Sequence, residues 1–285
     1  MTLLFRLLAH VRLSWMQRLG ALLGWLVWGL SPSYRRHFKA NVAAAGVAWQ
    51  AARPAIAATG AMLAELPWLW MRPHDPPLGQ RVQWDGAEHF EAAMQAGRGA
   101  IIMSPHLGCW EIGAQAIAEK YGPRFGPLVV LFRPARKAWL EPLVAQARKR
   151  PFLDSAPTTL AGVRTLIRAL RAGGYTAILP DQVPPLGQGV WAPFFGRDVY
   201  TMTLVSKLAQ QTGAVVIATW CERLPSGKGY CLHMRPVDAP ELRLTTTPPE
   251  QAAAAINREV QAMVLQAPGQ YLWGYARDKQ PRSEG

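Results

Sequence analysis

Acidic residues are scarce in this chain. Its 285 residues include 18 Asp and Glu against 31 Lys and Arg, which gives a formal net charge of +13 and a pI near 10.2. Such an excess of positive charge favours polyanionic partners: nucleic acid, anionic lipid or an acidic carrier protein. Half of the residues are hydrophobic, which suits a sizeable core and excludes a disordered chain. The length fits one large α/β domain, with or without a small appendage.

Cysteine is also rare, and several catalytic motifs are missing. The three cysteines are scattered and form no CxxC pair, so the sequence predicts neither a disulfide framework nor a zinc knuckle. The motifs GxSxG and HExxH do not occur, nor does a glycine-rich phosphate loop. We therefore expect no metal, no cofactor and no serine nucleophile. Free thiols are compatible with a domain that faces a reducing cytoplasm.

The N-terminus lacks an apolar run long enough to cross a bilayer. The uncharged stretch from Leu19 to Leu30 has twelve residues, whereas a spanning helix needs about 20. Upstream, Arg6, Arg12 and Arg18 recur every six residues among Leu, Trp, Val and Met. A basic amphipathic helix of this kind is typical of the headgroup layer of an anionic membrane.

The sequence therefore predicts a membrane-anchoring helix over residues 1–30, followed by a single catalytic domain over residues 31–285. The twelve tryptophans of the chain point the same way, because Trp favours the boundary between water and lipid. Whether the helix spans the membrane or lies on it stays open. A cleaved signal peptide is the alternative, but Ser31-Pro32-Ser33-Tyr34 is a poor cleavage site.

Strand and helix patterns alternate along the rest of the chain. Short, mostly apolar runs predict strands over residues 82–84, 100–103, 127–132, 175–179 and 214–219, and an edge strand over 230–234. Helices are predicted over residues 35–72, 88–96, 111–120, 139–150, 160–172, 203–211 and 252–265. This alternation predicts an α/β fold with a mainly parallel central sheet flanked by helices.

The segment from Ser104 to Glu111 follows a predicted strand and opens a predicted helix. His106 therefore lies at the carboxyl end of a strand, where open α/β sheets bind their ligands. Glu111 can hold the Nδ1–H of His106 while Nε2 takes a proton from an alcohol. Because no serine nucleophile is present, we interpret His106 as a general base that lets an acceptor hydroxyl attack a thioester directly. Taken alone, the spacing favours a hydrogen-bonded histidine at a strand end; its place after a buried strand strengthens the catalytic interpretation.

Other polar residues end neighbouring predicted strands. Arg133 can stabilise the oxyanion of a tetrahedral intermediate or bind a phosphate; the alternative is a solvated arginine. Asp181 can position the acceptor or brace an arginine. The aromatic segment 191–196 either lines a tunnel for an acyl chain or belongs to the core.

A basic stripe is predicted on the helix over residues 160–172. Arg164, Arg168 and Arg171 recur at i, i+4 and i+7 and so share one face. The stripe is either a docking site for an acidic acyl carrier protein or a solvated face.

Taken in order, these segments resemble the late (secondary) acyltransferases of lipid A biosynthesis, the lauroyl and myristoyl transferases of Gram-negative bacteria. The resemblance covers most of the chain and is carried by Pro105-His106-Leu107-Gly108-Cys109-Trp110-Glu111, Arg133-Pro134, Gly162-Val163-Arg164 to Gly173, Pro180-Asp181-Gln182, Pro193-Phe194-Phe195-Gly196, Leu208-Ala209, Thr212-Gly213-Ala214 and Tyr271-Leu272-Trp273.

The resemblance implies a glycerolipid-acyltransferase-like fold on the cytoplasmic face of the inner membrane. It also implies an acyl carrier protein as donor, without a further cofactor, and as acceptor a glucosamine disaccharide that bears β-hydroxyacyl chains. The family's His and acidic motif residues match His106 and Glu111, and its Arg-Pro arginine matches Arg133. Trp110, inside the same motif, and Arg164 become candidate substrate contacts.

The chain departs from the family pattern at two places. Pro105 stands where the family usually has Asn, and residues 273–279 stand where it usually carries His-Arg-Arg-Phe-Lys. These departures leave open an acyltransferase that acts on another lipid, such as an ornithine-type lipid or a polyene glycolipid.

Two other classes of function remain as alternatives. A nucleic-acid-binding protein would fit the charge, but the sequence has no basic tail, zinc pattern or paired aromatic RNA-binding motif, so we expect no nucleic-acid partner. A structural membrane-surface protein that has lost catalysis is the other alternative. The intact pair His106 and Glu111 argues against it.

Overall fold

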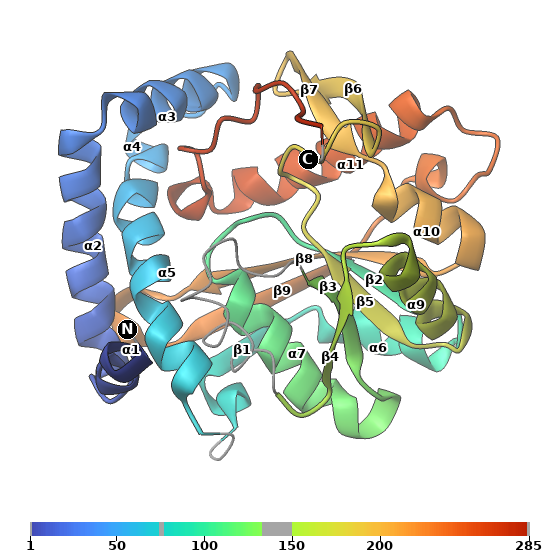
Figure 1. Cartoon of the computed structure of the whole chain (residues 1–285), viewed down its shortest axis with the longest axis horizontal. Coiled ribbons are helices and arrows are strands. Elements are labelled where there is room, and N and C mark those ends of the chain that lie inside the picture. The colour runs from blue at the N-terminus through green and yellow to red at the C-terminus, as the bar shows by residue number, and fades with distance from the viewer. Residues whose placement is uncertain (1, 74–76, 133–149, 284–285) are drawn as a thin grey trace.

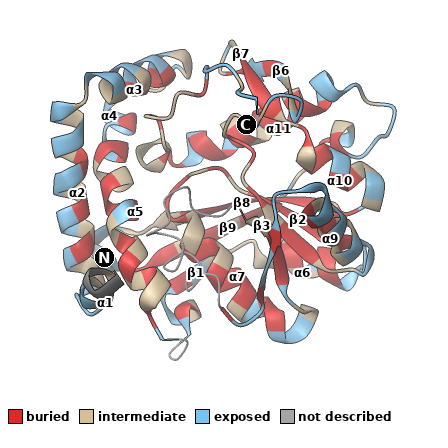
Figure 2. Ribbon diagram, viewed as in Figure 1, coloured by how far each residue is buried: buried red, intermediate tan, exposed pale blue. Residues whose placement is uncertain are grey.

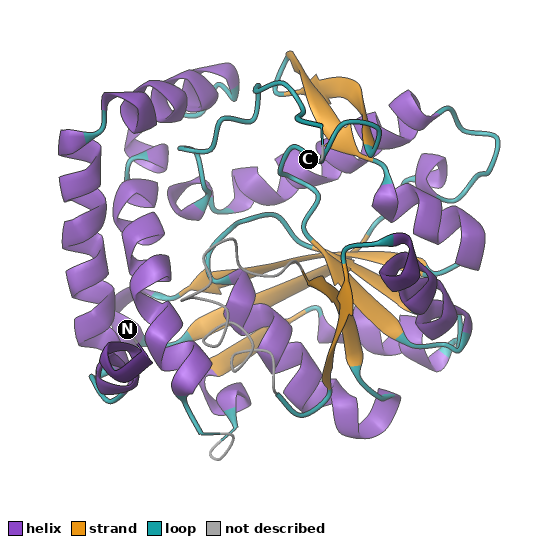
Figure 3. Cartoon of the chain, viewed as in Figure 1, coloured by secondary structure: helices purple, strands orange, loops and turns teal. Residues whose placement is uncertain are grey.

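The computed structural model describes residues 2–73, 77–132 and 150–283. Its centre is a seven-stranded sheet in the order β1-β9-β8-β2-β5-β3-β4 (Figures 1 and 3). The strands are β1 Val82–Asp85, β2 Ala100–Met103, β3 Leu128–Phe132, β4 Leu153–Pro157, β5 Tyr175–Ile178, β8 Val215–Arg223 and β9 Tyr230–Pro236. Neighbouring strands are parallel except β8 and β9, which are antiparallel. The predicted α/β fold with a mainly parallel sheet is confirmed.

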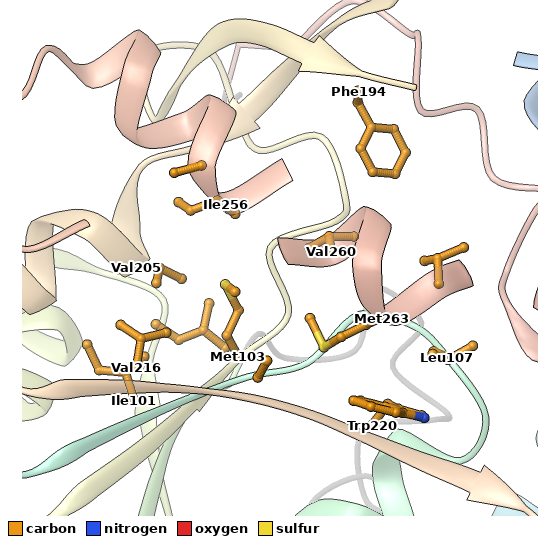
Figure 4. Close-up of a cluster of buried hydrophobic side chains, with 14 of the residues drawn as sticks. Ile101, Met103, Leu107, Phe194, Val205, Val216, Trp220, Ile256, Val260 and Met263 are labelled. Atoms are coloured by element: carbon orange, nitrogen blue, oxygen red, sulfur yellow. The ribbon is translucent and has the colours of Figure 1, made fainter. Parts of the chain in front are cut away.

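Helices cover both faces of the sheet (Figure 1). One face carries α6 (Ala87–Gln95) and α7 (Trp110–Phe125); the other carries α9 (Leu160–Arg171), α10 (Leu204–Thr212) and α11 (Pro249–Gln266). Side chains of a strand alternate between these two cores, since successive residues point to opposite faces. In β2, Ile101 and Met103 pack toward α11, while Ile102 packs toward α7. Figure 4 shows the first of these cores.

Several predicted elements differ in the structure. The helix expected over residues 35–72 is three helices, α3 (Pro32–Ala44), α4 (Trp49–Ala52) and α5 (Pro54–Met71), because proline favours the first helical position. The strand expected at an edge, β9, lies between β1 and β8 instead. Its side chains Tyr230, Leu232 and Met234 are fully buried. The helix expected over residues 139–150 falls almost entirely outside the described residues.

Three strands were not predicted: β4 and the two strands of a hairpin. The buried and exposed residues of β4 do not alternate regularly, so its sequence lacks the pattern of a strand. The hairpin of β6 (Gly189–Phe194) and β7 (Arg197–Met202) forms a separate two-stranded sheet that packs on α11. It contains most of the aromatic segment 191–196. Phe194 and Phe195 pack in or against the core, and Trp191 is exposed.

The N-terminal region is a pair of helices and not one continuous helix. α1 (Thr2–Ala9) is followed by a turn and by α2 (Leu13–Leu30), which runs alongside α5 (Figure 1). Glycines allow this close approach: a Cβ on Gly60 of α5 would lie 2.0 Å from the carbonyl oxygen of Gly20, and one on Gly24 would lie 2.3 Å from that of Ile56. Substitution at these positions would push the two helices apart.

A buried ion pair fastens this helical pair to the sheet. The carboxylate of Glu65, on α5, accepts hydrogen bonds from Arg223 Nε at 2.7 Å and from Gln17 of α2 at 2.7 Å, and from the hydroxyl of Tyr230 at 2.9 Å. Burial alone would raise the pKa of Glu65, but the charge and hydrogen bonds of Arg223 lower it below its ordinary value. Removal of one partner would leave a buried charge unpaired, which typically costs about 3–5 kcal/mol.

The outward face of α2 is apolar. The helix buries only Met16, Gly20 and Gly24, and its other residues are half-buried or exposed (Figure 2). The exposed set along α1, the turn and α2 is Leu7, Val11, Trp15, Leu19, Leu22, Leu23, Leu26, Val27 and Leu30. Within the described residues, none of the helices combines the length and the apolar character needed to cross a membrane.

Candidate active site

His106 lies in the loop between β2 and α7, and one glycine fixes the path of that loop. Gly108 has a φ of +64°, and a Cβ at this position would lie 1.9 Å from the carbonyl oxygen of Cys221 in β8. The same oxygen accepts a hydrogen bond from the backbone N–H of Cys109 at 2.8 Å. Only glycine lets the loop lie this close to β8.

Asp181 holds His106 at two points, one on the imidazole and one on the backbone. Its Oδ1 lies 2.7 Å from Nδ1 of His106, and its Oδ2 accepts the backbone N–H of His106 at 2.9 Å. The side chain of Asp181 is 3% exposed and that of His106 15% exposed. The carboxylate therefore accepts a hydrogen bond from Nδ1–H and leaves Nε2 as the proton-accepting nitrogen.

The charge of Asp181 is stabilised by its surroundings. Burial alone would raise the pKa of Asp181, but the charge and hydrogen bonds of His106, together with the charge of Arg277, lower it below its ordinary value. A carboxylate with a lowered pKa stabilises the folded state at pH values above the ordinary pKa of aspartate. That stabilisation is lost as the pH falls through the lowered pKa. Asp181 is thus ionised at neutral pH.

This contact corrects one prediction. We expected Glu111 to hold the Nδ1–H of His106, but Asp181 does so, and a ring nitrogen has one proton to donate. Glu111 lies in the first turn of α7 and is half-buried. The sequence placed Asp181 just after a predicted strand. In the structure that strand, β5, pairs in parallel with β2, with Met103 opposite Ile178, so the loops that follow them meet.

Trp110 and Gln182 complete the described surroundings of the imidazole. The Trp110 ring lies edge-on to the imidazole, with 4.6 Å between centroids. The carboxamide nitrogen of Gln182 lies 3.1 Å from Nε2 of His106. The structure thus brings Trp110 and Asp181 to His106 as candidates, and adds Gln182, which the sequence reasoning had not singled out.

Two candidates remain. Arg133 falls outside the described residues. Arg164 is exposed on α9, on the same face as Arg168 and Arg171, and not against the imidazole of His106.

The C-terminal segment after α11 braces both loops of this site. The backbone N–H of Leu272 donates to the carbonyl of His106 at 3.2 Å, and Gly108 N–H donates to the carbonyl of Gln270 at 3.1 Å. The hydroxyl of Tyr275 accepts the N–H of Val183 at 3.0 Å. These contacts were not predicted, because main-chain hydrogen bonds between distant segments leave no residue pattern.

Arg277 explains the second departure from the family pattern in structural terms. Its guanidinium is 2% exposed and donates to the carbonyl of Tyr200 at 2.6 Å and to Thr201 Oγ1 at 3.0 Å. This buried cation is near enough to lower the pKa of Asp181. The tail therefore serves the site through its backbone and through one buried arginine.

A second histidine cluster lies on β9 and is a poorer candidate. His233 contacts Asp85 Oδ2 through Nδ1 at 2.7 Å and Glu222 Oε2 through Nε2 at 3.2 Å. Because carboxylates face both ring nitrogens, neither nitrogen is open to a substrate hydroxyl. At His106 only one nitrogen faces a carboxylate.

Comparison with known proteins decides the family. The family model for bacterial lipid A biosynthesis acyltransferases matches residues 2–279. The chain belongs to this family. Its members are acyltransferases, so the chain is an O-acyltransferase of this family, as the order of motifs around His106 had indicated.

Three curated relatives carry lipid A names. The lauroyltransferase of Escherichia coli is 27% identical over 233 residues, which are 79% of this chain and 70% of that protein. The palmitoleoyltransferase of E. coli is 25% identical over 221 residues, 77% of this chain and 68% of its own length. The lipid A biosynthesis acyltransferase of Haemophilus influenzae is 29% identical over 196 residues, 69% of this chain but only 58% of that protein.

The name of a further relative indicates a different lipid acceptor. The phosphatidylinositol mannoside acyltransferase of Mycolicibacterium smegmatis is 26% identical over 162 residues, half of this chain and 47% of that protein. Similarity to this lipid acyltransferase means that family resemblance alone does not specify the acceptor.

The contact between Asp181 and His106 gives a first prediction. Asp181→Asn should lower kcat by about 10³–10⁴-fold, because an amide no longer selects the productive imidazole tautomer. Steady-state acyl transfer by the purified protein measures this, with Asp198→Asn, an exposed aspartate of β7, as the matched control. If Asp181→Asn kept near-wild-type activity and Glu111→Gln lost activity, Glu111 and not Asp181 would be the residue that orients the imidazole of His106.

Proposed function

We propose that this O-acyltransferase moves a fatty acyl chain from the thioester of an acyl carrier protein to a hydroxyl of a lipid A precursor, with His106 as general base. The observation that carries this proposal is the contact of the buried Asp181 carboxylate with Nδ1 of His106 at 2.7 Å, found at the strand ends of a lipid A acyltransferase.

The reaction needs no covalent enzyme intermediate. Nε2 of His106 takes the proton of the acceptor hydroxyl as its oxygen bonds to the thioester carbon. The resulting tetrahedral intermediate collapses by breaking the carbon–sulfur bond, and the imidazolium returns the proton to the departing thiolate of the carrier's phosphopantetheine arm. Asp181 stabilises the imidazolium between these two steps. The proposal requires no metal and no other cofactor.

Neighbouring residues supply binding. The Trp110 ring beside His106 offers an apolar wall for the acyl chain or acceptor. Glu111 lies in the first turn of α7, directly after the loop that carries His106. We propose that it acts in the site without accepting the hydrogen bond from Nδ1 of His106. Arg133 is retained as the proposed oxyanion or phosphate contact.

A related acceptor is the second candidate. The similarity to a phosphatidylinositol mannoside acyltransferase over half of the chain and the departures at Pro105 and residues 273–279 favour it over an unrelated chemistry. The mechanism at His106 is the same for either acceptor.

Lipid profiles distinguish these outcomes. In cells that carry His106→Ala or lack the gene, one acyl chain should be missing from lipid A, as measured by mass spectrometry of extracted membrane lipids. Because the variant lacks its base, it should resemble the deletion. A chain missing from another lipid would keep the mechanism and change the acceptor. Unchanged lipids in both strains would contradict acyl transfer itself.

The donor is proposed to dock on α9. Arg164, Arg168 and Arg171 are exposed along one face of this helix, whose first turn follows the carboxyl end of β4 and so begins on the same side of the sheet as His106. An acyl carrier protein is strongly acidic, and complementary charge raises the rate of encounter.

Charge reversal tests this surface. The triple variant Arg164→Glu, Arg168→Glu, Arg171→Glu should raise KM for lauroyl-acyl carrier protein roughly tenfold, since each exposed ion pair contributes about 0.2–1 kcal/mol. With lauroyl-phosphopantetheine, which lacks the carrier surface, KM should not change. Arg243→Glu, at an exposed position outside α9, is the control. Equal KM values for the triple variant and the wild type would exclude this docking face.

Attachment to the cytoplasmic face of the inner membrane is proposed to use the outward face of α2. Leu22 is 69% exposed and Leu26 54% exposed on this face. Contiguous apolar surface of this kind marks an interaction site. The exposed Arg12 and Arg18 add attraction to anionic headgroups.

Vesicle sedimentation tests the attachment. The double variant Leu22→Glu, Leu26→Glu should lose most binding to vesicles that contain anionic phospholipid, because two charges would enter the apolar layer. Leu265→Glu, an exposed leucine of α11, should bind as the wild type does. Undiminished binding of the double variant would place the attachment elsewhere.

A further inference from the structure

The reactive nitrogen of His106 is covered by a neutral side chain. The carboxamide nitrogen of Gln182 lies 3.1 Å from Nε2. Since Nδ1 faces a carboxylate oxygen at 2.7 Å, the ring proton lies on Nδ1, and Gln182 must be the donor in the contact with Nε2. Gln182 therefore occupies the place around Nε2 that the acceptor hydroxyl needs.

We propose that Gln182 is a catalytic residue, whose carboxamide N–H leaves Nε2 when the acceptor hydroxyl arrives and then donates a hydrogen bond to the oxyanion of the tetrahedral intermediate. This inference rests on the proposed acyl transfer and adds a second contact at its reacting atoms.

Distances support this exchange of partners. A hydroxyl that transfers its proton must approach Nε2 to about 2.6–3.2 Å, the same range in which the Gln182 nitrogen already lies. When the hydroxyl replaces Gln182 as the partner of the Nε2 lone pair, its oxygen and the displaced amide nitrogen lie next to each other. The oxyanion forms on the carbon bonded to that hydroxyl oxygen, so it arises within reach of the same N–H.

The backbone on both sides of Gln182 is held in place. Asp181 is buried and bonded to His106, and the N–H of Val183 donates to the hydroxyl of Tyr275 at 3.0 Å. The change of partner therefore requires only side-chain rotation of Gln182. A donor on a fixed backbone needs little reorganisation during the reaction, which is what makes such groups effective.

The step balances with the groups already named. The hydroxyl proton moves to Nε2, the oxygen–carbon bond forms, and the carbonyl electron pair moves to the oxygen that Gln182 binds. Collapse restores the carbonyl, the carbon–sulfur bond breaks, and the thiolate takes the proton from Nε2.

Gln182→Met tests the proposal, because methionine keeps the length of the side chain and removes the donor. With lauroyl-acyl carrier protein and a glucosamine-disaccharide lipid A precursor as substrates, kcat should fall by about 10²–10³-fold, the effect of losing one oxyanion donor, with little change in either KM. Gln210→Met, which removes one exposed amide contact on α10, is the matched control. His106→Ala is assayed beside it.

The alternatives give opposite results. If Gln182 only covered Nε2 in the resting enzyme, its removal would eliminate a competitor of the acceptor, and kcat would be unchanged or higher, which overturns the proposal. If His106→Ala is inactive and Gln182→Met is fully active, this inference fails and the proposed function stands; an active His106→Ala contradicts the proposed function itself. Should thermal unfolding show Gln182→Met to be misfolded, Gln182→Leu decides: it also lacks the donor and places no charge beside Nε2, so its kcat must fall for the proposal to hold.

Discussion

The site depends on one buried hydrogen bond, from the Nδ1–H of His106 to the carboxylate of Asp181. Without it the imidazole could adopt either tautomer, and Nε2 would not be a defined proton acceptor. The bond is supported from several directions: by a second contact from the backbone of His106, by burial that excludes water, and by the charge of Arg277, which helps to keep the pKa of Asp181 low.

The sheet topology is what makes this bond possible. β2 and β5 are adjacent and parallel, so loops that are 75 residues apart in the chain emerge side by side. Gly108 lets the first loop lie against β8, and the C-terminal segment joins the two loops through Leu272 and Tyr275. Asn41 extends this connection to α3, since its side chain donates to the carbonyls of Trp273 and Tyr275. The helix that directly follows α2, the carrier of the exposed apolar face, is therefore hydrogen-bonded to the segment that braces the catalytic loops.

Much of the fold could be predicted from the sequence because buried parallel strands have a strong apolar signature. The strands that hold the site, β2 and β5, were placed within a residue of their observed bounds, and His106 was recognised from its position after β2. The partner of His106 was assigned to Glu111 because local spacing is easier to read than strand order. Once β2 and β5 are known to pair, Asp181 is the expected neighbour. The bracing by residues 268–277 rests largely on main-chain hydrogen bonds, which leave no residue pattern to read.

The protonation state of the imidazole is the most direct test of this account. Long-range ¹H–¹⁵N correlation NMR of ¹⁵N-histidine-labelled protein, with the His106 signals identified by their loss in His106→Ala, reports which ring nitrogen carries the proton. The account predicts that the neutral ring of the wild type carries its proton on Nδ1, that this tautomer is unchanged in Glu111→Gln, and that it is altered in Asp181→Asn. A ring protonated on Nε2 in the wild type, or one that changes in Glu111→Gln and not in Asp181→Asn, would contradict it.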